Sequence, residues 1–369
     1  MTLAQFEIQL IGILVASACA LTGIFLILRR MAMMSDAISH AILLGIVLAF
    51  FVTKDLASPF LIIAAALSGI LMVSLVELLN GTRLVREDAS IGLVFPLLFS
   101  IGVILISRYA GNIHLDTDAV LLGELAFAPF NRLSLFGYDL GPKSIYTIST
   151  ILLLNIVFIF VFYKEIKLST FDAGLAASLG FAPGLLHYAL MSLVSITAVG
   201  SFDAVGSILV VAFMIAPPAT AYLLTDKLTR MIWISVIIGS VSAVSGYWIA
   251  HFADASIAGS MATMCGVLFL LTFLFSPYRG IIAIMHRRIQ QKWEFAQIML
   301  TVHLHQHQDL PEHSFEKKMN HCHIHMKWNE KFTQRVIKLA TEKDLITEKN
   351  GYLYLTKQGA ATAEEAITT

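Results

Sequence analysis

Residues 8–28 read IQLIGILVASACALTGIFLIL and contain no lysine, arginine, aspartate or glutamate. A helix of about 20 apolar residues crosses the roughly 30 Å hydrocarbon core of a bilayer. It can do so because it satisfies its own backbone hydrogen bonds without water. No basic region precedes the run, and the run is too long for the core of a signal peptide. We therefore expect residues 8–28 to form an uncleaved first transmembrane helix.

Similar runs follow, and charged residues gather in the short breaks between them. Of all residues, 57% are hydrophobic and 14% are charged, against roughly 25% charged in soluble domains. This pattern predicts an all-α polytopic membrane protein with eight or nine transmembrane helices. The runs lie near residues 8–28, 38–53, 59–79, 89–107, 144–163, 186–202, 204–224, 231–250 and 259–277.

Lysine and arginine occur in alternate breaks, and this bias predicts sidedness because short basic loops stay in the cytoplasm. The pattern predicts a protein of the cell membrane (plasma or inner membrane) whose N-terminus lies on the external side. Residues 164–184 and the C-terminal segment would be cytoplasmic. The basic residues concerned are Arg29, Arg30, Arg83, Arg86, Lys164, Lys167, Lys227, Arg230, Arg279, Arg287 and Arg288.

The segment 108–142 would then be external, and it carries His114, Asp116, Asp118 and Glu124. Two interpretations are open: the segment is an ordinary solvated loop or a docking surface for a partner that delivers cargo.

The stretch SDAISHAILLGI, residues 35–46, places an acid and a histidine four residues apart at Asp36 and His40. On a helix these share one face. A carboxylate and an imidazole together can bind Mn²⁺, Fe²⁺ or Zn²⁺, and ionisable groups at membrane depth usually face a pathway. The alternative is that Ser35 or Asp36 caps the helix and that His40 is satisfied within the bundle.

The stretch FYKEIKLSTFDAGLAASLGF, residues 162–181, is a charged break followed by a short amphipathic segment. Ser169–Asp172 is typical of a capping region, and Gly180 of a helix stop. The segment is either a loop helix at the interface or a coupling helix, which seats in a cytoplasmic ATPase and transmits its closure.

Two adjacent prolines, Pro217 and Pro218, lie inside the apolar stretch 200–225. Prolines inside a helix break or kink it. Such a break is tolerated at membrane depth where protein covers the backbone or where it lines a cavity. We expect a kink here, either purely structural or lining a path.

Residues 284–369 are polar and form a second predicted domain after the membrane domain 1–283. Helical patterns at 293–302 and 327–344 precede two β-prone runs around Asn350-Gly351, a strong hairpin signal, and a last helix at 357–366. This order is that of a winged helix, which predicts a small α+β domain.

The C-terminal segment holds eight of the chain's 12 histidines. The alternating His-x-His-x-His pattern is typical of metal binding and would place the ligands on one face of an extended strand. Solvated surface or an expression artefact is the alternative. The residues that could hold a regulatory metal are His303, His305, His307, His321, Cys322, His323 and His325.

No Walker A loop, nucleophile elbow, dinucleotide-binding glycine motif or HExxH occurs in the sequence. We therefore do not expect an enzyme, and any ATP hydrolysis must come from another subunit. Two other hypotheses are a secondary metal transporter and a membrane-tethered metal sensor. The first needs coupling carboxylates, and the predicted spans hold few acids beyond Glu77 and Asp203.

Several of these stretches, in this order, resemble the ABC-3 family of bacterial metal-importer permeases, which serve Mn²⁺, Zn²⁺ and Fe²⁺. The resemblance covers about residues 8–283. Where the family typically reads GDAISHAVLPG, this chain has Ser35 for the glycine and Leu44 for the proline. The matching stretches are LRRMAMMSDAISHAILLGI (28–46), FYKEIKLSTFDAGLAASLGF (162–181), VGSILVVAFMIAPPATAYLLT (205–225) and ASIAGSMATMCGVLFLLTFLFSPYRGI (255–281).

The resemblance implies the type II ABC importer fold, with Asp36 and His40 binding the ion transiently on the translocation path. It implies a homodimeric or paired permease in the lipid bilayer, an extracytoplasmic metal-binding protein and no permanently bound cofactor. A pair of cytoplasmic ATPase subunits would dock at about 169–180. The residues implied in coupling to the ATPase are Ser169, Phe171, Asp172, Leu175, Ala176 and Gly180.

The C-terminal segment resembles the winged-helix module of metal-dependent repressors, which is fused to some of these permeases. Its charge is almost balanced, with 12 lysines and arginines against 10 aspartates and glutamates. This balance argues against strong DNA binding, so we expect a regulatory or dimerising domain.

Overall fold

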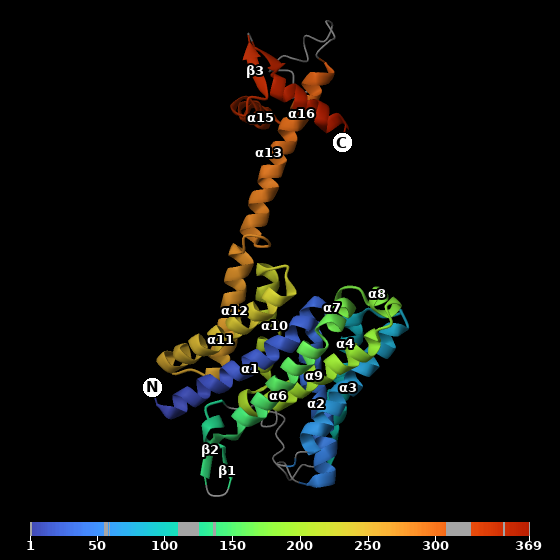
Figure 1. Cartoon of the computed structure of the whole chain (residues 1–369), viewed down its shortest axis with the longest axis vertical. Helices are drawn as coiled ribbons and strands as arrows, with labels where there is room; N and C mark the ends of the chain where they lie inside the picture. The colour runs from blue at the N-terminus through green and yellow to red at the C-terminus, as the bar shows by residue number, and fades with distance from the viewer. Residues whose placement is uncertain are drawn as a thin grey trace. The chain divides into compact units, whose positions relative to one another are not determined.

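The computed structural model describes residues 2–54, 58, 60–109, 125–135, 138–307, 326–349 and 351–368. The chain forms two compact units, Met1–Gly280 and Ile281–Thr369, and each is described by itself. In the first unit, the described residues include nine helices that are long and apolar enough to span a membrane, which confirms the predicted helical membrane fold (Figure 1). These helices are α1 (Leu3–Leu28), α2 (Ala32–Thr53), α3 (Phe60–Gly81), α4 (Glu87–Tyr109), α6 (Lys143–Val161), α9 (Pro183–Val205), α10 (Ser207–Leu224), α11 (Leu228–Ala253) and α12 (Ile257–Phe275).

Helix α1 lies at the centre of the first unit. It packs against α6, α9, α10 and α11, and its residues Ile11, Val15 and Cys19 are fully buried. Helix α2 packs mainly against α3 and α4. An apolar side chain gains little by leaving lipid for another helix, so such bundles depend on close packing and small residues.

Two glycines permit close approaches of backbone to backbone between these helices. A Cβ atom on Gly23 of α1 would overlap the carbonyl oxygen of Met214 in α10, and one on Gly45 of α2 would overlap that of Ala64 in α3. Any larger residue at position 23 or 45 would therefore push two helices apart.

Helix α10 runs without interruption through Pro217 and Pro218, so the break that the prolines permit does not occur. Pro218 has no N–H to donate to the carbonyl of Met214. That carbonyl lies against Gly23, where the neighbouring helix covers it. Coverage of a freed backbone group by protein is what allows proline inside a membrane helix.

Short elements mark the two opposite ends of the first unit (Figure 1). At one end, α7 (Tyr163–Phe171) and α8 (Ala173–Ser178) lie between α6 and α9. At the other end, the 3₁₀ turn η1 (Ala128–Phe130) is followed by an antiparallel hairpin of β1 (Arg132–Leu135) and β2 (Tyr138–Pro142).

The second unit contains α13 (Ile281–Gln306), α15 (Glu330–Glu342), the hairpin β3 (Ile346–Lys349) and β4 (Tyr352–Leu355), and α16 (Lys357–Thr368). Ile346 pairs with Leu355 across the hairpin. Leu300, Val336 and Leu353 belong to one buried cluster. The order of helix, helix, hairpin and helix agrees with the expected one. Helix α13 is longer than expected, because one continuous helix from Ile281 to Gln306 contains the expected 293–302 helix.

Candidate functional site

Asp36 and His40 lie in the second and third turns of α2 and face one another. The His40 Nε2 atom is 3.7 Å from Asp36 Oδ1. The side chains are 37% exposed at His40 and 44% exposed at Asp36, so both can reach a ligand. In the part of the chain that the structure describes, no group of three or more His, Cys, Asp or Glu residues could hold a metal ion. Two donors leave several coordination positions to water, which suits transient binding.

The capping alternative for this stretch is wrong. Helix α2 begins at Ala32, its N-cap residue is Met31, and no side chain makes the cap hydrogen bond. Ser35 is buried instead, and its hydroxyl donates to the Met214 sulfur of α10 at 3.3 Å. Ser35 thus holds this part of α2 against α10, and the Asp36 carboxylate takes no part in a cap.

His40 is flanked by two aromatic rings of α4. The centroids of Phe95 and Phe99 lie 5.8 Å and 5.7 Å from that of the imidazole. Aromatic contacts at these separations restrict the rotation of the ring. Helix α4 therefore orients the imidazole beside Asp36.

The α7–α8 segment has the caps that its sequence predicts. Asp172 is the N-cap of α8, and its side chain accepts from the Leu175 N–H at 2.9 Å. Gly180 has φ +87°, in the left-handed region that favours glycine, and its N–H donates to the Ala177 carbonyl at 3.0 Å. The segment is therefore a short, separately capped element.

One side of the α7–α8 segment is packed and the other is apolar and exposed. Ser169 and Ala176 are buried, whereas Phe171, Leu175 and Leu179 are exposed. Exposed large apolar side chains mark a surface that contacts another protein or the membrane.

Arg29, directly after α1, connects the α7–α8 segment to the bundle. Its guanidinium donates to Ser169 Oγ at 3.1 Å and to Thr170 Oγ1 at 3.3 Å. Its Nη1 atom lies 2.8 Å from His187 Nδ1 of α9, and His187 Nε2 lies 2.7 Å from Glu77 Oε1 of α3. Burial lowers the pKa of Arg29, but arginine stays protonated in proteins.

Sequence reasoning did not find this cluster. The available signals were a basic pair that ends one apolar run and an acid, Glu77, inside another. Neither signal names the partners, because Arg29 and His187 are 158 positions apart in the sequence.

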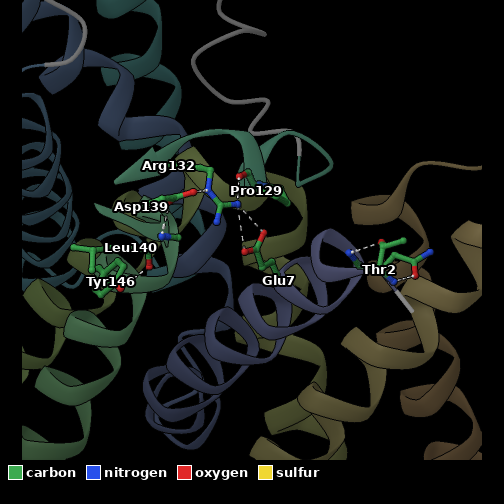
Figure 2. A network of polar contacts seen from close by, with 9 residues as sticks. Thr2, Glu7, Pro129, Arg132, Asp139, Leu140 and Tyr146 are labelled. Carbon is green, nitrogen blue, oxygen red and sulfur yellow. Dashed lines mark hydrogen bonds and ion pairs between the residues drawn. The ribbon is translucent and has the colours of Figure 1, made fainter. Parts of the chain in front are cut away.

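The opposite end of the first unit carries a second polar network (Figure 2). Arg132 of β1 pairs with Asp139 of β2, and its Nη1 lies 3.4 Å from Oε1 of the buried Glu7 of α1. The Gly141 N–H, and then Arg132, lower the pKa of Asp139. The network ties the hairpin to the first helix. The four ionisable residues singled out in the external segment, His114, Asp116, Asp118 and Glu124, lie outside the described residues.

The histidines of the second unit lie partly in a helix, so the expected strand is wrong for them. His303 and His305 belong to the last turn of α13, because the buried Leu300 and Leu304 keep helical spacing in the core. The rings of His303 and His307 are 4.7 Å apart, whereas His305 points to a different side of the helix. The remaining residues of the group, His321, Cys322, His323 and His325, lie outside the described residues.

Comparison with known proteins gives relatives along almost the whole chain. The chain is 46% identical to the zinc transport system membrane protein TroD of Treponema pallidum over 98% of both chains. It is 48% identical to the manganese transport system membrane protein MntD of Bacillus subtilis, over 79% of this chain and 99% of that protein. The match to TroD therefore extends into the second unit, which argues against an expression artefact.

The fold agrees with that of a solved structure as well. PsaBC from Streptococcus pneumoniae, in complex with Fab, matches with a TM-score of 0.62 and 27% identity, over 76% of this chain and 94% of that one. The model of the ABC 3 transport family matches residues 5–276, which cover the nine candidate spans except for the first two residues of α1. The chain belongs to the ABC 3 transport family.

Proposed function

We propose that the chain is the membrane-spanning permease subunit of an ABC importer that moves Mn²⁺, Zn²⁺ or Fe²⁺ into the cytoplasm. The observation that carries this proposal is the half-exposed pair Asp36 and His40 in a chain whose relatives are named for zinc and manganese transport. The chain is a transport subunit rather than an enzyme, and a partner ATPase hydrolyses the ATP. Family membership argues against the two alternatives, a secondary metal transporter and a membrane-tethered metal sensor.

The two ends of the first unit would have different partners. The α7–α8 segment, with Ser169 to Gly180, would dock on the cytoplasmic ATPase. This assignment is supported by its exposed apolar side chains, by Lys164 and Lys167 within α7 and by Arg29 beside it. The positive-inside rule assigns these basic residues to the cytoplasm. The hairpin end would receive the extracytoplasmic metal-binding protein.

Asp36 and His40 would form a transient binding site (here called the metal station) for the ion on the translocation path. A carboxylate and a neutral imidazole suit these borderline metals, and two protein ligands bind less tightly than the closed four-ligand sites of structural zinc. Release therefore needs only a modest change in geometry. Closure of the ATPase pair would supply that change through the α7–α8 segment.

The finer assembly is part of the same proposal. The permease would work as a homodimer or with a second permease chain. Residues 284–369, which follow the membrane domain 1–283 in the sequence, would form a cytoplasmic, winged-helix-like regulatory domain. The tilted pair of His303 and His307 rings supports a regulatory metal there.

Competition uptake tests the proposal and identifies the metal. The complete complex is reconstituted in proteoliposomes with ATP inside and the binding protein outside. Each of Mn²⁺, Zn²⁺ and Fe²⁺ is then offered against the other two. We expect ATP-dependent uptake with a preference for one of the three, whereas uptake driven by a pH gradient alone would contradict the proposal.

A further inference from the structure

Arg29 joins three helices at the α7–α8 end of the first unit. It is the C-cap residue of α1, and its guanidinium contacts Ser169 and Thr170 of α7 and His187 of α9. Arginine has five N–H donors in a rigid fork, so a single side chain can hold both helices at fixed angles. Lysine would present a single ammonium group and could not reproduce this geometry.

The backbone that follows Arg29 is a tight corner. Three residues, Arg29 to Met31, join α1 to α2. Arg30 has φ +63°, a left-handed conformation that costs energy for a residue other than glycine. The Met31 N–H donates to the Leu26 carbonyl at 2.8 Å. A short, hydrogen-bonded corner passes a displacement of Arg29 on to the first turns of α2.

Those first turns carry Asp36 and His40. The path from the α7–α8 segment to the metal pair therefore consists of side-chain bonds to Arg29, a rigid corner and seven residues of chain. Ser35, beside Asp36, also bonds to Met214 of α10. A shift of the corner would therefore act on Asp36 against this contact with α10.

His187 has a definite orientation in this cluster. A guanidinium can only donate, so His187 Nδ1 must accept from Arg29. The ring proton then lies on Nε2, and this nitrogen lies 2.7 Å from Glu77 Oε1. A neutral imidazole thus stands between a cation and an anion. This brings α3 into the same cluster.

We propose that Arg29 is a positioning residue that transmits movement of the α7–α8 segment through the α1–α2 corner to Asp36 and His40, with His187 and Glu77 holding its guanidinium in place. The inference rests on the proposed function and specifies how the docking segment reaches the metal station. Loss of Arg29 should uncouple ATP hydrolysis from metal import.

The test compares import with ATP hydrolysis in the complete complex in proteoliposomes. We expect Arg29→Ala to raise the ratio of ATP hydrolysed to metal imported at least fivefold. The metal affinity of the nucleotide-free complex and the amount of bound ATPase should stay at the wild-type level. Arg230→Ala, which removes an exposed arginine near the start of α11, is the matched control and should leave the ratio unchanged.

A pair of substitutions at His187 keeps the test decisive even where Arg29→Ala fails to assemble. His187→Gln offers a carbonyl to Arg29 and an amide N–H to Glu77, so the ratio should stay within twofold of wild type. His187→Leu removes both contacts and should raise the ratio as Arg29→Ala does. Equal ratios for Gln and Leu would overturn the role of the cluster.

Two other outcomes also decide the matter. An unchanged ratio in an assembled Arg29→Ala complex, or a loss of bound ATPase in proportion to the loss of import, would show that Arg29 does not transmit movement. A wild-type complex that imports no metal with ATP would contradict the proposed function, and this result is seen before any variant is compared.

Discussion

Gly23 of α1 lies against the carbonyl oxygen of Met214 in α10, the carbonyl to which Pro218 cannot donate a hydrogen bond. The smallest residue of one helix thus covers the backbone group that a proline leaves free in the other. The same Met214 accepts a hydrogen bond from Ser35 through its sulfur. This residue therefore joins three helices next to the proposed metal station.

Gly23→Ala should destabilise the protein, because the new Cβ atom would overlap the Met214 carbonyl. Overpacking of this kind typically costs about 1–3 kcal/mol, and here it should lower the melting temperature in detergent. Gly266→Ala in α12 is the matched control, since a Cβ there meets nothing within 4 Å. We expect the control to be neutral or slightly stabilising, because alanine is a better helix former by about 1 kcal/mol. Equal melting temperatures for Gly23→Ala and the wild type would contradict the close packing.

His40→Ala should weaken metal binding by the nucleotide-free complex at least tenfold, the equivalent of about 1.4 kcal/mol. The substitution removes one of two protein donors without disturbing a cap or a buried hydrogen bond. Equilibrium dialysis with Mn²⁺ and Zn²⁺ measures the affinity. Asp203→Asn, at an exposed carboxylate of α9, is the control and should bind as the wild type does. Wild-type affinity in His40→Ala would exclude the pair as the station.

Leu175→Glu should reduce the amount of ATPase that co-purifies with the permease, because it places a charge in the exposed apolar row of the α7–α8 segment. The side chain is 47% exposed, so the folded bundle should tolerate the change. Leu84→Glu, at an exposed leucine between α3 and α4, introduces the same charge elsewhere. Loss of the ATPase in the control alone would show that the docking surface is not on α8.

Arg132→Ala should destabilise the hairpin end, because the buried Glu7 carboxylate loses its charged partner. An unpaired buried polar group costs about 1–3 kcal/mol. The double substitution with Glu7→Gln should recover much of this loss, since no charge is then left buried. Thermal unfolding of the two variants in detergent decides the point, and equal stability of the single and double variants would contradict it.

The same network predicts a dependence on pH. The pKa of Asp139 is lowered from its ordinary value of 3.8, so the folded protein holds its proton less tightly than the unfolded chain does. Its contribution to stability is therefore present above that value and is lost as the pH falls through the lowered pKa. Asp139→Asn should flatten the acid limb of the melting temperature between about pH 5 and pH 2, and an unchanged limb would argue against the assignment.

The helices were predictable and the polar clusters were not. An apolar run of about 20 residues is stable in lipid as a helix, because a helix satisfies its own backbone hydrogen bonds. Runs such as residues 8–28 therefore predict the nine spans. The cap at Asp172 and the stop at Gly180 are local and were also predictable. Arg29, His187 and Glu77 meet only through the packing of α1, α3 and α9. No local pattern carries that information.

For the histidines of the second unit, a local sequence pattern gave a wrong prediction. An alternating pattern favours a strand, but His303 and His305 lie in a helix because Leu300 and Leu304 bury themselves at helical spacing. Core formation outweighs a short local pattern when the two conflict. Pro217 and Pro218 also lie inside one continuous helix, α10, and the kink expected at them stays a prediction.

The most direct test of the central claim is ATP-dependent metal uptake by the reconstituted complex, measured for the wild type and for Asp36→Asn. The substitution keeps the size of the side chain and removes its charge. We predict saturable uptake that requires ATP in the wild type and at least a tenfold lower rate in Asp36→Asn, with the ATPase still bound. Uptake by Asp36→Asn at the wild-type rate, or wild-type uptake that does not depend on ATP, would contradict the account.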